Sequence, residues 1–204
     1  HATALEYAKK SAELILCDYN EEILQKTKNA CLKHTDKIQT LSFDLSKTNE
    51  INSALKLINK NYASIDRLIL VGGISQRASA LKTDISIDRK IMEINYFGHI
   101  YITKKILPLL LKTEKPAIGV VSSISGKFGF HLRSAYAASK FALHGFFESL
   151  RLEHKNDNLS VSIICPGRIN TPISLSAITE DGKKHGEMDP GQEKGMPAEK
   201  CAAK

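Results

Sequence analysis

Two residues with the chemistry to move a proton stand four positions apart, Tyr136 and Lys140, in the run SAYAASK at 134–140. Small residues that favour a helix dominate this run, and a spacing of four places both side chains on one helix face. A Lys ammonium beside a phenol lowers the pKa of the phenol, which would make Tyr136 a usable acid or base near neutral pH. Most Tyr–Lys pairs at this spacing are solvated neighbours, so the pair alone leaves both interpretations open.

The elements that must position this pair alternate along the chain. Short apolar runs typical of strands lie at 12–17, 37–43, 66–71, 117–123 and 160–165. Segments with helical periodicity lie between them, at 20–33, 48–62, 88–112 and 134–155. This alternation predicts an α/β fold, a doubly wound parallel sheet of the Rossmann type, as a single domain over residues 1–204.

The two ends of the chain carry helical patterns without an adjoining strand. HATALEYAKK at 1–10 should be a helix, although a helix that covers a parallel sheet normally follows a strand. PAEKCAAK at 197–204 resembles the beginning of another helix with no strand after it. We therefore expect the first strand with its glycine-rich turn, and the last strand, to be missing from this chain. The stretch 180–197, rich in Gly, Pro and charge, predicts a mobile loop.

Several residues follow the strands at the edge where open α/β sheets bind ligands. Asp18 stands where a carboxylate can accept both ribose hydroxyls of an adenine nucleotide. The other candidates for contact with a cofactor at this edge are Asp44, Leu45, Gly72, Gly73, Pro166, Gly167, Ile169 and Thr171. A carboxylate here could also cap a helix, and a Pro-Gly pair could simply turn the chain. Their shared place at one edge favours a ligand site.

Two further polar residues could join Tyr136 and Lys140. Ser123 ends the fourth apolar run thirteen residues before Tyr136, which allows a loop to bring both to the same edge. Its hydroxyl could donate a hydrogen bond to a substrate oxygen, or merely satisfy a turn. Asn95 lies inside a predicted helix, where Asn is unfavourable unless its amide has a specific partner.

The chain resembles the short-chain dehydrogenase/reductase family in the order and spacing of four segments: NYFG at 95–98, Ser123, YAASK at 136–140 and PGRINT at 166–171. The resemblance spans about residues 1–172. It implies an oxidoreductase that interconverts an alcohol and a carbonyl, with Tyr136 as general acid/base and Ser123 orienting the substrate oxygen. It also implies that Lys140 bonds the nicotinamide ribose, that Asn95 holds a water linking Lys140 to solvent, and that residues 172–204 form the substrate loop.

The sequence departs from the family pattern in two places. The glycine-rich turn that receives the cofactor pyrophosphate should precede residue 1, and the family's Asn-Asn-Ala-Gly corresponds to Leu70–Gly73, which keeps only the last residue. Asp18 is followed by Tyr19 and not by Arg, which favours NAD(H) over NADP(H), because a carboxylate repels a 2′-phosphate. A catalytically silent NAD(P)-binding sensor or scaffold of the same fold stays open as an alternative.

Composition restricts the partners. The formal charge is +7, but Lys and Arg are scattered among acids without a basic stripe, so a nucleic-acid binder ranks a distant third. The four Cys residues are far apart and no His or Cys has metal-ligand spacing, so we expect reduced thiols and no metal site. Neither a secretory signal nor a bilayer-spanning apolar run is present, and a cytoplasmic location is expected.

Two apolar patterns point to a substrate and an assembly. Apolar residues after Pro172 suggest an apolar small-molecule alcohol or carbonyl compound, or they could equally pack within the loop itself: Ile173, Leu175, Ile178, Met188 and Met196. The helix predicted at 135–155 carries more apolar side chains than one core face needs, which suggests a homodimer or homotetramer unless the sheet buries them all: Phe141, Leu143, Phe146, Phe147 and Leu150.

Overall fold

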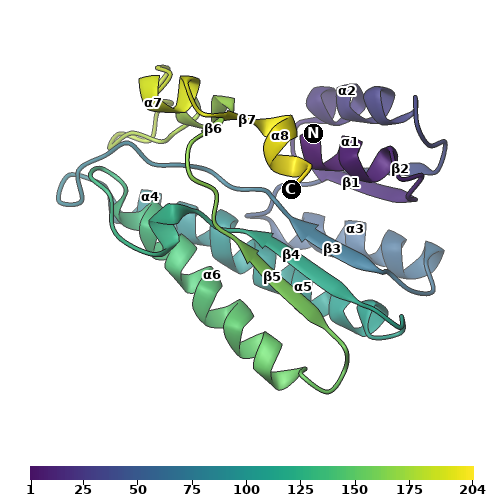
Figure 1. Cartoon of the computed structure of the whole chain (residues 1–204). Coiled ribbons are helices and arrows are strands. Elements are labelled where there is room, and N and C mark those ends of the chain that lie inside the picture. The colour runs from purple at the N-terminus through teal and green to yellow at the C-terminus, as the bar shows by residue number, and fades with distance from the viewer.

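The computed structural model describes residues 1–204 and contains the five predicted strands in two parallel sheets (Figure 1). β1 (Leu14–Asp18) pairs with β2 (Ile38–Ser42). β3 (Arg67–Leu70), β4 (Ala117–Val121) and β5 (Ser160–Ile164) form the second sheet in the order β3-β4-β5. No strand pairing joins β1 to β3. The prediction of an α/β fold with parallel strands is confirmed.

Helices follow the strands in the predicted order. The segments α1 (Ala2–Ala8) and α2 (Glu21–Cys31) lie beside the β1–β2 sheet, and α3 (Thr48–Asn61) follows β2. The long helix predicted at 88–112 is instead three segments, α4 (Ile85–Met92), the π-helical turn η1 (Glu93–Phe97) and α5 (Gly98–Leu110). α6 (Ser134–Glu153) carries the Tyr-Lys pair. Single π-helical turns inside helices are frequent at functional sites.

The main core lies between the β3–β5 sheet and one layer of helices. Ile118 and Val120 of β4 face the helices, and both are fully buried. The helices α3, α5 and α6 contribute aliphatic and aromatic side chains to the same cluster, including Ile51, Ile106, Leu110, Leu143 and Phe147. Burial of these apolar faces against the sheet fixes α6 on it, and so fixes where Tyr136 and Lys140 lie.

The last forty residues contain only short elements. These are η3 (Pro172–Ser174), α7 (Pro190–Glu193), α8 (Ala198–Ala202) and the parallel pair β6 (Ile169–Asn170) and β7 (Met196–Pro197). An ion pair between Arg77 and Asp189 ties this region to the loop after β3. The stretch 180–197, predicted as a mobile loop, is therefore anchored at its middle and adds α7 and β7 to the fold.

Both termini lie near the β1–β2 sheet, where α1 and α8 contact each other (Figure 1). All four cysteines are free thiols. No cluster of three or more His, Cys, Asp or Glu side chains is arranged to hold a metal ion. None of the helices combines the length and the apolar character needed to cross a membrane.

Candidate active site

Tyr136 and Lys140 occupy the first two turns of α6, on the same face, as their spacing predicts. The Lys140 Nζ atom lies 5.8 Å from the centroid of the Tyr136 ring. Lys140 is only 4% exposed, and Tyr136 is half-buried. Burial of an ionisable pair changes its chemistry, because removing water penalises the charged form of each group.

A glutamine from a distant loop caps this helix. The residue before α6, Arg133, makes no side-chain capping bond. Instead, the fully buried Gln76 accepts hydrogen bonds through Oε1 from the backbone amides of Ala135, at 2.8 Å, and Tyr136, at 3.3 Å. The first amides of a helix have no partner within the helix, so this amide oxygen stabilises the turn that holds Tyr136. Gln76 was not among the predicted site residues.

Lys140 donates from Nζ to the carbonyl oxygen of Val121, at 2.9 Å. Burial lowers the pKa of Lys140 from 10.5 to about 8. An ammonium has three N–H groups, and Val121 uses one of them. Lys140 therefore lies against the end of β4 with donor capacity to spare.

The pKa of Tyr136 is raised, which corrects the expectation that Lys140 would lower it. Burial is the main cause, and a hydrogen bond with Ser123 and the charge of Arg133 offset it in part. The Lys140 ammonium lies over the ring and donates to Val121, not to the phenol oxygen. The phenol of Tyr136 is therefore protonated at neutral pH in this arrangement.

Ser123 lies at the end of β4, as predicted, next to Tyr136. It is the N-cap of the short helix η2 (Ile124–Gly126), and its Oγ accepts a hydrogen bond from the amide of Ser125 at 3.1 Å. The turn-capping interpretation and the contact with the phenol are thus compatible, because a hydroxyl oxygen has two lone pairs and one proton.

Asn95 lies within η1 and is fully buried, so the specific partner that its helical position required is present. Its Oδ1 accepts from the amide of Ile74 at 2.8 Å, and its Nδ2 donates to the carbonyl of Ile74 at 2.9 Å and to Oγ of Ser139 at 3.0 Å. Both amide protons are in use. Asn95 thereby joins the loop after β3 to α6, and its role in holding a water stays a prediction.

The glycine pair after β3 allows close packing against these residues. A Cβ atom on Gly73 would lie 3.0 Å from Oδ1 of Asn95 and 3.6 Å from Nζ of Lys140. A Cβ atom on Gly72 would lie 2.8 Å from Cδ1 of Leu45. A larger residue at position 73 would press on Asn95 of η1 and Lys140 of α6, whereas one at position 72 would press on the side chain of Leu45. Gly72, Gly73, Asn95 and Lys140 therefore form one tightly packed unit.

The predicted cofactor carboxylates make local bonds. Oδ1 of Asp18 accepts from the amide of Asn20 at 2.9 Å, while Asn20 itself caps α2. Oδ1 of Asp44 accepts from the amide of Ser46 at 2.8 Å and from its hydroxyl at 2.7 Å. Each carboxylate has a second oxygen that can accept further bonds. Their structural and ligand-binding interpretations are thus compatible.

The residues predicted after β5 form an open turn. The Pro166 carbonyl accepts from the amide of Ile124 at 3.1 Å, which joins this turn to η2. A Cβ atom on Gly167 would meet no atom within 4 Å, so this glycine borders open space. Ile169 pairs with Met196 in the β6–β7 sheet, and Thr171 is the N-cap of η3 without a side-chain bond.

His99 is a buried titratable residue that sequence reasoning missed. It is 1% exposed, and burial followed by the charge of Lys140 lowers its pKa to about 3, so the imidazole is neutral. Its Nδ1 has no hydrogen-bond partner. Its Nε2 lies 3.7 Å from where a Cβ of Gly72 would stand. No spacing motif in the sequence points to this contact, which depends on the packing of α5 under the glycine loop.

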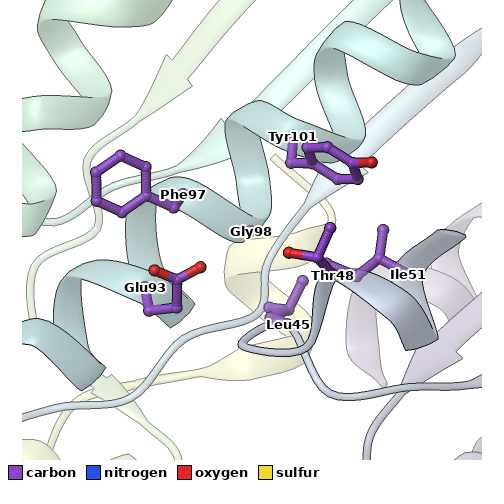
Figure 2. A pocket seen from close by; sticks show the side chains of 7 residues that line it. All are labelled: Leu45, Thr48, Ile51, Glu93, Phe97, Gly98 and Tyr101. Atoms are coloured by element: carbon purple, nitrogen blue, oxygen red, sulfur yellow. The ribbon is translucent and has the colours of Figure 1, made fainter.

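A pocket of about 250 Å³ lies where the loop after β2 meets η1 and α5 (Figure 2). Its lining residues are Leu45, Thr48, Ile51, Glu93, Phe97, Gly98 and Tyr101. None of Ser123, Tyr136 and Lys140 lines it. The pocket thus lies apart from the proton-transfer residues and shares only Leu45 with the predicted cofactor contacts.

The arrangement of Ser123, Tyr136 and Lys140 agrees with the resemblance found in the sequence, and comparison with known proteins decides the family. A model of the short-chain dehydrogenase family matches residues 1–181. The chain belongs to this family. Members of this family are oxidoreductases. One relative, Dehydrogenase/reductase SDR family member 7B of Xenopus laevis, is 39% identical to this chain over 197 residues. That match covers 94% of this chain and 61% of the frog protein, so the chain spans less than two thirds of this relative.

Solved structures of short-chain dehydrogenases have the same fold. A short-chain dehydrogenase of Shigella flexneri 2a, in complex with NADP, superposes with a TM-score of 0.84 at 27% identity, over 97% of this chain and 80% of that one. A short-chain dehydrogenase of Escherichia coli CFT073, in complex with NADPH, superposes with a TM-score of 0.82 at 28% identity. That match covers 96% of this chain and 79% of the other. Both comparisons cover nearly all of this short-chain dehydrogenase domain.

Proposed function

We propose that this protein interconverts an alcohol and a carbonyl compound by hydride transfer with a nicotinamide cofactor. The single observation that carries the proposal is the cluster of Ser123, Tyr136 and Lys140 at the carboxyl ends of the parallel strands, in a chain of this family. Ligands of open α/β sheets bind at this edge. Substrate and cofactor would therefore meet above the start of α6.

Tyr136 exchanges a proton with the substrate oxygen. Its raised pKa keeps the phenol protonated at neutral pH, so the group is ready to act as an acid. Ser123, which lies next to the phenol, donates a hydrogen bond to the same oxygen and polarises it. This pair favours carbonyl reduction at neutral pH, because alcohol oxidation needs the phenolate.

The residues present fit a nicotinamide cofactor at the reacting end. Bound there, the cofactor supplies or accepts the hydride. Lys140 has N–H groups beyond the one bonded to Val121, and these can bond the ribose hydroxyls. Gly167 borders open space, so a ligand can approach its backbone closely, and Gly73 beside Lys140 is proposed as a backbone contact. Asp44, Leu45, Pro166, Ile169 and Thr171 are proposed as further contacts along the strand ends.

The choice between NAD and NADP rests on Asp18. Its carboxylate favours NAD(H), since it can accept both hydroxyls of the adenosine ribose and repels a 2′-phosphate. The two structural neighbours described above were solved with NADP and NADPH, so likeness to them gives no support to NAD. We propose NAD(H) on the chemistry of Asp18 alone.

Assembly and substrate are proposed from apolar surface. Leu143, Phe147 and Leu150 of α6 are buried in the core, whereas Phe141 is 45% exposed. The remaining exposed apolar surface of α6 would pack against a second copy of the chain in a homodimer or homotetramer. The residues after Pro172 would line the pocket for an apolar alcohol or carbonyl compound.

Tyr136→Phe tests the proposal. The ring still packs on α6, so the fold and cofactor affinity should stay unchanged, while turnover of a panel of ketones and secondary alcohols should fall at least roughly hundredfold. Tyr7→Phe, which removes the same hydroxyl from a tyrosine of α1, is the matched control and should keep full turnover. Equal rates for wild type and Tyr136→Phe would contradict the mechanism. A wild type that binds cofactor but turns over no member of the panel would favour the alternative, a silent NAD(P)-binding sensor.

A further inference from the structure

We propose that His144 is a positioning residue that acts through Ser122 on the part of α6 that carries Lys140. This inference rests on the proposed function, because its catalytic consequence requires Lys140 and Ser123 to act in the reaction. His144 follows Lys140 by one helical turn and is 7% exposed. It is a buried titratable group that the mechanism above does not use.

Three side-chain bonds join the end of β4 to α6. The Lys140 Nζ donates to the carbonyl of Val121 at 2.9 Å, and Oγ of Ser122 donates back to the carbonyl of Lys140 at 3.3 Å. The Nε2 of His144 lies 3.1 Å from the same Ser122 Oγ. Ser122 is 3% exposed, so its hydroxyl has no competing solvent. Lys140 is therefore held at both its side chain and its main chain by residues next to Ser123.

The direction of these bonds follows from the neighbours of the imidazole. The Nζ of Lys127 lies 3.2 Å from Nδ1 of His144. A Lys ammonium can only donate, so Nδ1 accepts and the ring proton belongs on Nε2. Nε2–H can then donate to Oγ of Ser122, whose own proton is free for the carbonyl of Lys140. The chain runs from Lys127 through His144 and Ser122 to Lys140.

The shape of the surrounding backbone fits this arrangement independently. A Cβ atom on Gly126 would lie 2.5 Å from Oγ of Ser122 and 3.1 Å from Cδ2 and Nε2 of His144. Real Cβ atoms do not approach other atoms to 2.5 Å, so only glycine leaves the hydroxyl–imidazole contact intact. The turn η2 therefore closes over the contact and keeps water from it.

Two other polar groups face the ring. Oε1 of Glu148 lies 3.5 Å from Nδ1, and Sγ of Cys165 lies 3.6 Å from Nε2. Glu148 is mostly exposed, and its carboxylate faces the same nitrogen as Lys127. A carboxylate can only accept, so Glu148 favours a proton on Nδ1, whereas Lys127 favours an Nδ1 without one. Cys165 is a weaker hydrogen-bond acceptor than the Ser122 hydroxyl. The shorter contacts, to Lys127 and Ser122, favour the Nε2–H tautomer.

The consequence is alignment of the reacting groups. Ser122 precedes Ser123, and its bond to Lys140 sets the spacing between the end of β4 and the first turns of α6. Misplacement of reacting groups by about 1 Å can lower a rate by about a hundredfold. The same bond sets where Ser123 stands relative to Tyr136, and these two residues act on the substrate oxygen. Loss of the His144–Ser122 bond should thus lower kcat more than it weakens cofactor binding.

The first test uses nitrogen NMR of the full chain labelled with 15N-histidine, which needs no turnover. Ring shifts of His144, assigned by comparison with His144→Gln, should report a protonated Nε2 and a bare Nδ1. A proton on Nδ1 in the neutral ring would overturn the proposal. The NMR result does not depend on the proposed function. If the proposed function is wrong, the wild-type protein will instead show no turnover.

The second test uses kinetics of four variants with unchanged circular dichroism. His144→Leu keeps the volume but removes the bond, and kcat should fall about tenfold with the KM for cofactor changed less than about threefold. His144→Gln can still donate to Ser122, and kcat should stay within about threefold of wild type. Ser122→Ala combined with His144→Leu should be no slower than Ser122→Ala alone, because both act through one bond.

Other results would overturn the proposal. These are a His144→Gln variant as slow as His144→Leu, or losses that multiply in the double variant. If His144→Leu does not fold, Lys127→Met serves instead, because Lys127 is exposed and its loss cannot leave a core cavity. It should lower kcat in the wild-type background and have no effect in the Ser122→Ala background, and an equal effect in both backgrounds would refute the coupling.

Discussion

Lys140→Met should stabilise the folded protein while abolishing turnover. Methionine has an unbranched chain of similar length, so it can fill the site of the Lys140 side chain without a charge. Lys140 is 4% exposed, and burial lowers its pKa from 10.5 to about 8. The folded state therefore carries a penalty for keeping this ammonium charged, and the unfolded state does not.

The structure sets the size and the pH window of this effect. Lowering the pKa from 10.5 to about 8 corresponds to roughly 3 kcal/mol, unfavourable to folding below the folded pKa. Between pH 8 and 10.5 the unfolded chain binds more protons than the folded one, so wild-type stability rises with pH and the penalty disappears. The Val121 carbonyl loses its bond in the variant, which costs about 1 kcal/mol. The net gain at pH 7 is about 2 kcal/mol.

Urea unfolding of wild type and Lys140→Met at pH 7 and pH 10 measures this difference. The variant should have the higher free energy of unfolding at pH 7, and the gap should close at pH 10. Lys155→Met, an exposed lysine just after α6, is the matched control and should change stability by less than about 0.5 kcal/mol at either pH. A variant less stable than wild type at pH 7, or a gap that does not depend on pH, would refute the reasoning.

Three further predictions concern the cofactor, the proton and the assembly. Wild type should bind NADH more tightly than NADPH by cofactor fluorescence, and Asp18→Ala should narrow the difference; tighter NADPH binding by wild type would contradict the role of Asp18. Because the pKa of Tyr136 is raised, the rate of alcohol oxidation should climb as pH rises above 8, and a flat profile from pH 7 to 10 would exclude the phenolate as base. Light scattering at micromolar concentration should give a dimer or tetramer, and a monomer would exclude the assembly through α6.

The parts of the fold that could be predicted are those governed by local pattern. Strands appear in the sequence as short apolar runs, and each of the five predicted runs overlaps a strand of the structure. The Tyr-Lys pair was predictable for the same reason, since helix geometry alone places residues four apart on one face. The division of the helix predicted at 88–112 was missed, because the π-helical turn at Glu93–Phe97 has no periodicity signal.

The parts that could not be predicted depend on contacts between distant segments. Gln76 caps a helix that begins 58 residues later, and His99 lies beneath the glycine pair after β3. The pKa of Tyr136 was misjudged for a related reason. The sequence shows that Lys140 is near, but only the packing shows that the phenol is buried and that the ammonium is directed to Val121.

Burial sets the protonation states of Tyr136 and Lys140 at neutral pH. Burial disfavours charge on both groups, so it raises the pKa of Tyr136 and lowers the pKa of Lys140 to about 8. At pH 7 the phenol is thus neutral while the ammonium still holds its proton. A neutral phenol beside a cation is a proton donor whose conjugate base gains a favourable charge nearby once the proton has left. In the proposed reaction, a neutral Tyr136 phenol is the form that would donate a proton to a carbonyl oxygen during reduction.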